Sequence, residues 1–232
     1  VESCNDLGKK EEFINALKRI RSIPIKTPDL NNKVFGYSYF LELSHYIKNG
    51  QYQKGVALVG KIKKGFDRFG NKFDKHTKLF LHYTFSVLYF ATKDYHTALK
   101  WINIILNDKE KELRKDIYCF AQILNLIIHY EMSNHALLEY AVKTAIHFLD
   151  KRSRLFILEK TVLDFFRKEL PKADGTEQRT EAFKELKQEI KEIIKNDFEK
   201  KALDYFDIIS WVESKIENKS FAEIVREKAQ NS

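Results

Sequence analysis

Glycine, proline and cysteine are all scarce in this sequence of 232 residues. Eight glycines and three prolines are too few for a collagen-like, low-complexity or turn-rich all-β protein. The two cysteines, Cys4 and Cys119, lie far apart and form no CxxC pair, which argues against a disulfide framework or a cysteine-based zinc site. Because this cysteine usage is typical of a reduced compartment, we expect a cytoplasmic protein.

Long apolar runs are also missing. No run approaches the roughly 18 apolar residues that a membrane span requires. The N-terminal region has no basic segment followed by an apolar one, so we expect no signal peptide. Since the sequence begins with Val1 rather than methionine, we expect it to be a fragment of a longer protein, organised as one domain over residues 1–232.

What the chain has in abundance is helical periodicity. Apolar residues recur at steps of three and four, as Leu138, Ala141 and Ala145 do, and sustained two-residue alternation is absent. The expected helices cover about residues 11–21, 37–47, 52–69, 78–91, 95–106, 113–130, 136–149, 154–170, 181–195, 198–216 and a final segment from 220. The pattern predicts an all-α fold of ten or eleven helices, with Pro24 and Pro28 in an extended linker.

Three helix breaks share a pattern along the chain. They read Asn49-Gly50-Gln51-Tyr52, Thr92-Lys93-Asp94-Tyr95 and Ser133-Asn134-His135. Equivalent positions are 43 residues apart from Tyr52 to Tyr95, and 40 residues apart from Tyr95 to His135. Recurrence with a period of this size indicates a stack of helical hairpins.

The middle unit resembles the tetratricopeptide repeat. The family's first-helix tyrosine, its Asp-Tyr pair in the turn and its small second-helix alanine have counterparts in Tyr89, Asp94, Tyr95 and Ala98. Lys93 replaces the usual turn glycine, and Gly55 replaces the alanine in the first unit. The resemblance covers residues 36–150 and implies a right-handed superhelix of antiparallel helix pairs, followed by C-terminal helices over 177–232. Another family of α-hairpin repeats and an irregular helical bundle are the alternatives.

Motifs that would indicate an enzyme or a cofactor site are absent. None of the seven histidines belongs to an HExxH motif or an i,i+4 pair, and neither a GxSxG elbow nor a glycine-rich phosphate-binding loop occurs. Cys119 lies in a strongly apolar stretch, where an inert buried thiol is expected. The sequence therefore predicts no catalytic, cofactor-binding or metal-binding residues. An enzyme on a helical scaffold remains a hypothesis without positive support.

One segment, residues 48–78, contains five of the eight glycines and most of the net charge. It has nine basic and two acidic residues, a net charge of +7, whereas the whole chain carries +8. One interpretation is a basic surface that binds an anionic partner, a nucleic acid or an acidic protein, through Lys61, Lys64 and Arg68. The other is a solvent-exposed helix whose glycines permit close packing of its neighbours.

Aromatic residues on the first helix of each hairpin form a second candidate surface. In tetratricopeptide folds these helices line a concave groove that receives a peptide or protein. The residues that the resemblance implies for this groove are Tyr37, Phe40, Phe80, Tyr83, Phe120 and Tyr130. Tyr37, Tyr83 and Tyr130 are the expected anchors, and burial between repeats is the other interpretation. We therefore expect a non-enzymatic protein–protein interaction module or scaffold, with a regulatory helical protein that binds an anionic partner as the alternative.

Overall fold

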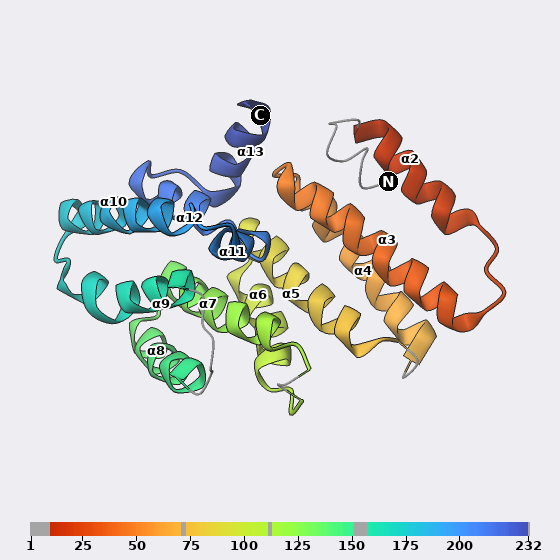
Figure 1. Cartoon of the computed structure of the whole chain (residues 1–232), viewed down its shortest axis with the longest axis horizontal. Helices are drawn as coiled ribbons and strands as arrows, with labels where there is room; N and C mark the ends of the chain where they lie inside the picture. The colour runs from red at the N-terminus through yellow and green to blue at the C-terminus, as the bar shows by residue number, and fades with distance from the viewer. Residues whose placement is uncertain (1–9, 71–72, 111–112, 151–156, 232) are drawn as a thin grey trace.

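The computed structural model describes residues 10–70, 73–110, 113–150 and 157–231, and all regular structure in these ranges is helical (Figure 1). The α-helices are α2 Lys10–Ser22, α3 Pro28–Lys48, α4 Tyr52–Phe69, α5 Lys75–Ala91, α6 Tyr95–Leu106, α7 Lys115–Glu131, α8 His135–Asp150, α9 Ile157–Asp164, α10 Thr176–Ile193, α11 Asp197–Lys200, α12 Ile208–Ile216 and α13 Phe221–Asn231. A π-helical turn Phe165–Glu169 and a 3-10 turn Leu170–Lys172 follow α9, and a 3-10 turn Lys201–Asp204 follows α11. The all-α prediction is confirmed, with twelve α-helices in the described ranges rather than ten or eleven.

Two predicted boundaries are wrong for identifiable local reasons. Pro28 is the first residue of α3 rather than part of the linker, because its fixed φ and missing N–H suit the first turn of a helix. The single helix expected over 198–216 is interrupted between α11 and α12. Asp207 caps α12, where its carboxylate accepts a hydrogen bond from the Ser210 amide at 2.9 Å.

The three recurring breaks fold into the same kind of turn. Gly50, Lys93 and Ser133 have positive φ angles of 63°, 64° and 55°. In each turn the next amide donates to the carbonyl five residues earlier: Gln51 to Tyr46 at 2.8 Å, Asp94 to Tyr89 at 2.9 Å, and Asn134 to His129 at 3.0 Å. This bond defines the Schellman motif, which usually has glycine at the left-handed position. Asn218, between α12 and α13, also has a positive φ. The turn that contains it was not among the recurring breaks identified from the sequence.

The core is built around α5 and α7. Consecutive helices from α2 to α10 pack on each other, and the alternate helices α3, α5, α7 and α9 also contact their neighbours in that series. Leu81, Phe85 and Leu88 of α5 are fully buried, as expected for a helix that is apolar nearly all round. Cys119 is buried in α7, as predicted, whereas Cys4 lies outside the described residues.

The C-terminal helices return to the earlier hairpins. Trp211 of α12 lies against Tyr130 of α7 at a ring-centroid distance of 5.9 Å. Phe221 at the start of α13 contacts Phe90 of α5 and Tyr52 of α4, at 5.6 and 5.8 Å. In Figure 1 this blue part of the chain lies beside the end of α3 and across the row that contains α5 and α7. Residues far apart in sequence therefore share one core.

The glycines of α4 have more than one role. A Cβ atom added at Gly55 would lie 2.5 Å from Leu88 Cδ2, and one added at Gly65 would overlap the Phe35 ring. These two glycines support the close-packing interpretation. Gly60 is different, because a Cβ atom there would meet nothing within 4 Å.

Candidate binding groove

A groove runs between α3 and α5, and we call it the α3–α5 groove. The residues that line it from α3 include Lys33, Tyr37, Phe40, Ser44, Ile47 and Lys48. They recur at steps of three or four and therefore lie on one face of the helix. From Lys33 to Lys48 the groove follows 15 residue steps, or about 22 Å of helix.

Two cavities make up this groove. The first has a volume of about 480 Å³ and is lined by Tyr37, Phe40 and Phe80 together with basic side chains. The second has a volume of about 630 Å³ and extends from Phe40 and Phe80 to the residues after α11. The Phe40 and Phe80 rings pack edge to face with centroids 4.8 Å apart, so both cavities share one aromatic floor.

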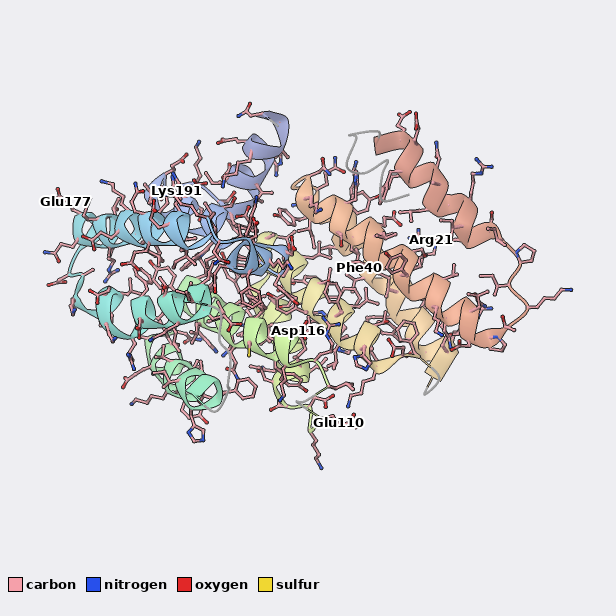
Figure 2. The ribbon with its side chains drawn as sticks, in the orientation of Figure 1. Arg21, Phe40, Glu110, Asp116, Glu177 and Lys191 are labelled. Atoms are coloured by element: carbon pink, nitrogen blue, oxygen red, sulfur yellow. The ribbon has the colours of Figure 1, made fainter. Side chains whose placement is uncertain are left out.

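Helix α2 closes one side of the second cavity through Phe13. Arg21, near the end of α2, holds this helix on α3 by donating to Glu42 Oε2 at 2.5 Å and to the Ser38 carbonyl at 2.7 Å. Its guanidinium also lies 3.8 Å from the centroid of the Tyr39 ring. Figure 2 shows Arg21 where α2 meets α3. These bonds determine the position of that side of the groove.

The opposite side is formed by the turn after α11. Tyr205 stacks on Phe120 of α7 with centroids 4.1 Å apart and an interplanar angle of 10°. Its hydroxyl donates to Asp116 Oδ2 at 2.8 Å, and Arg114 donates to the same carboxylate at 2.6 Å. In Figure 2, α5 lies between α3, which carries Phe40, and α7, which carries Asp116.

Hydrogen bonding stabilises particular protonation states in this Arg114–Asp116–Tyr205 cluster. Burial by itself would raise the pKa of Asp116, but the bonds from Arg114 and Tyr205 lower it below its usual range. Burial, followed by the bond to Asp116, raises the pKa of Tyr205 to about 12. The turn is therefore attached to α7 by an ionised carboxylate and a neutral phenol at neutral pH.

The structure separates the three tyrosines that were expected as anchors. Tyr37 is 54% exposed and lies in the groove. Tyr83 is only 2% exposed, and its hydroxyl has no hydrogen-bond partner among the described residues. Tyr83 lines the second cavity, so the structure places it in the floor of the groove rather than at its exposed surface, and its role in binding a partner stays a prediction.

Tyr130 is also removed from the groove, although it is only partly buried. Its ring contacts Phe166, Phe183 and Trp211 at centroid distances of 6.0, 5.8 and 5.9 Å. Together with the stacking of Tyr205 on Phe120, these contacts cover the α7 part of the expected groove with the chain's own C-terminal half. The structure therefore places Tyr130 outside the α3–α5 groove, and its role in binding a partner stays a prediction.

The basic residues of α4 form a different surface. The α4 basic face consists of the exposed side chains Lys54, Lys61, Lys63, Lys64 and Arg68. None of them lines the α3–α5 groove. In the part of the chain that the structure describes, no carboxylate lies within ion-pair distance of these five side chains. In contrast, Lys184 of α10 pairs with Glu181 at 2.9 Å.

Several groove residues were not identified from the sequence. Phe13, Lys201 and Tyr205 reach the groove from helices or turns that are distant in sequence from α3 and α5. No local pattern could have found them, because their place depends on how α2 and the C-terminal segment pack. Lys33 could have been suspected, because it lies four residues before Tyr37 on α3, whereas Arg114 precedes the first residue of α7.

These features define an all-α protein of helical hairpins with an aromatic groove along one face. Within residues 10–70, 73–110, 113–150 and 157–231, no three histidine, cysteine or acidic side chains are grouped as metal ligands. No helix in the same ranges has the length and apolar character needed to cross a membrane. No protein-family model, curated protein or solved structure matches this chain.

Proposed function

We propose that this chain is a non-enzymatic, cytoplasmic protein-interaction module, a tetratricopeptide-like superhelix that binds a peptide segment of a partner protein. The observation that carries the proposal is the α3–α5 groove, which follows about 22 Å of α3 from Lys33 to Lys48 and has Tyr37, Phe40 and Phe80 among its lining residues. Aromatic side chains are enriched at the energetically dominant positions of protein interfaces. A groove of this length accommodates about six residues of an extended peptide.

Two further features support a hairpin stack as the framework. The turns at Gly50, Lys93 and Ser133 share one backbone geometry, and alternate helices pack on each other along the row. Stacked hairpins present long continuous surfaces, which is how such proteins bind their partners. The right-handed superhelix is part of this proposal.

Replacing Tyr37 with alanine tests the groove directly. Peptides would be selected on the intact chain from a random library, and their dissociation constants measured by fluorescence anisotropy. We expect Tyr37→Ala to weaken binding about tenfold, because an exposed aromatic side chain at the centre of an interface is commonly an energetic hot spot. The matched control is Tyr140→Ala, because Tyr140 is 70% exposed on α8 and far from the groove residues in sequence. Equal effects of the two substitutions, or no effect of the first, would contradict the proposal.

The α4 basic face favours a second candidate function, the binding of an anionic partner such as a nucleic acid. Its cations form no ion pair with a carboxylate among the described residues, although the exposed Asp67 lies on the same helix. Four of the five are lysines, which act as point charges towards phosphate rather than as bidentate forks. The ammonium groups of Lys61 and Lys63 lie over the rings of Tyr39 and Trp101, 5.8 and 5.6 Å from the centroids.

A 20-base-pair DNA duplex is the probe for this second function. For three phosphate contacts, the affinity is expected to fall roughly 40-fold between 50 and 200 mM salt. Reversing Lys61, Lys64 and Arg68 to glutamate should abolish the binding. The control reverses Lys184, Lys191 and Lys195, three exposed lysines in and just after α10, and makes the same change in net charge. Salt-independent binding, or an equal loss in the control, would exclude this role for α4.

A further inference from the structure

The chain itself already contains one short segment that packs on the alternate helices α5 and α7. In the sequence Leu203-Asp204-Tyr205-Phe206-Asp207, two aromatic residues are flanked by carboxylates. Tyr205 stacks on Phe120 of α7, and Phe206 packs against Phe90 of α5 at a centroid distance of 5.5 Å. An aromatic side chain next to acidic residues is thus a ligand that this row of helices accepts.

The α3–α5 groove continues from that internal interface. Tyr205, Asp204 and Lys201 line the second cavity, whose floor is the Phe40–Phe80 pair. Phe120 is only 3% exposed beneath Tyr205, whereas Phe40 and Phe80 still line cavities. The groove therefore offers a partner the same kind of aromatic platform on which Tyr205 is stacked.

The charges around the groove are predominantly positive. Lys33, Lys48, Arg114 and Lys201 line it, with Asp204 as the single carboxylate among the lining residues. At the first cavity, Lys33 pairs with Asp29 at 2.8 Å, and Arg114 pairs with Asp116 at 2.6 Å.

At the second cavity, the two lysines have no such partners. No carboxylate in the described part of the chain lies within ion-pair distance of Lys48 or Lys201. One lysine ends α3 and the other follows α11, so they enter the cavity from two different elements. A ligand with an apolar anchor and nearby carboxylates would satisfy both the floor and these two ammonium groups.

We propose that the α3–α5 groove binds acidic peptides that contain an aromatic anchor, with the aromatic ring on Phe40 and Phe80 and carboxylates paired with Lys48 and Lys201. This inference rests on the proposed function and names its partner class. The same charges disfavour basic peptides as ligands, since such peptides would meet Lys48 and Lys201 with only Asp204 as a compensating carboxylate.

The experiment uses peptides selected from a random library on the intact chain, and a fluorescein-labelled peptide that copies residues 202–208. Selected sequences should be enriched in an aromatic residue flanked by Asp or Glu. The copied peptide should bind the wild type, and its affinity should fall at least tenfold with Lys48→Glu and Lys201→Glu combined. The matched control, Lys184→Glu with Lys191→Glu on the exposed side of α10, has the same change in charge and should alter the affinity less than twofold.

A charge exchange protects the test from effects on folding. A second peptide would contain lysine in place of Asp204 and Asp207. This lysine peptide should bind the Lys48→Glu, Lys201→Glu protein more tightly than it binds the wild-type protein. Recovery of binding in this combination cannot come from an unfolded protein. If selected peptides bind through Tyr37 but lack acidic residues, this inference is overturned and the proposed function stands. If no peptide is selected at all, the proposed function itself fails.

Discussion

Replacing Glu131 with alanine is expected to lower the free energy of unfolding by about 3 kcal/mol, because it leaves buried donors without an acceptor. Glu131 ends α7 and accepts from Trp211 Nε1 at 2.7 Å and from Lys215 Nζ at 2.5 Å. The Tyr95 hydroxyl of α6 is 3.4 Å from its other carboxylate oxygen. Trp211 is fully buried, so its indole N–H has no access to water when the carboxylate is removed. Urea unfolding followed by circular dichroism measures the change.

Two further variants decide whether the network is responsible for this loss. Glu139→Ala removes an exposed glutamate that pairs with Lys143 at 2.8 Å on α8, and should cost less than about 0.5 kcal/mol. With Trp211→Phe as background, Glu131→Ala should cost less than in the wild type, because the buried N–H donor is already gone. Equal costs in both backgrounds would show that the bond to Trp211 contributes nothing.

Alanine substitutions at two glycines of α4 are expected to change stability in opposite directions. Gly60→Ala should raise the free energy of unfolding by about 0.5–1 kcal/mol, since alanine is the better helix former and the site has open space. Gly55→Ala should lower it by about 1–2 kcal/mol, because the new methyl group would lie 2.5 Å from Leu88 Cδ2 in the core. Each variant serves as the other's control in the same urea titration. A gain in stability at both sites would mean that Leu88 can move aside, and that close packing does not account for Gly55.

The α3–α5 groove and the α4 basic face are suited to different classes of partner. The α3–α5 groove combines an aromatic floor with two lysines that form no ion pair within the described residues, whereas the α4 basic face carries cations and no exposed large apolar side chain in the same ranges. The first arrangement fits a peptide with side chains to bury. The second fits a diffuse array of negative charge, whose binding weakens as the salt concentration rises.

Local patterns were sufficient for the helices and their turns. Three- and four-residue steps identified the buried faces, and the breaks at Gly50, Lys93 and Ser133 correctly marked equivalent turns. The errors arose where a single residue begins a helix or interrupts one. Pro28 begins a helix instead of preventing one, and the capping residue Asp207 divides a stretch that is apolar enough to be read as a single helix.

The groove could be predicted only in part. Tyr37 and Phe40 share one face of α3, because residues three apart on a helix lie on the same face, whereas the contact of Phe40 with Phe80 of α5 depends on how the two helices pack. Tyr83 and Tyr130 are also aromatic residues at helical spacing. However, Tyr83 is buried, and Tyr130 is covered by Phe166 and Trp211 from later in the chain. An aromatic residue at helical spacing has the same appearance whether its ring meets solvent or another helix.

The sequence by itself determined an all-α chain, the scarcity of turns, the recurring hairpin breaks and the concentration of positive charge in residues 48–78. Each of these depends on residue types and on separations of a few positions, where backbone geometry sets the outcome. Only the tertiary structure decided which of the aromatic residues on α3, α5 and α7 remain accessible to a partner. That choice depends on the return of Tyr205, Phe206 and Trp211 over α5 and α7, a contact between residues about 80 or more positions apart. The hydrophobic effect is non-directional, so an apolar side chain gains from burial against any apolar neighbour. Which neighbour it meets is therefore decided by how all the helices pack together.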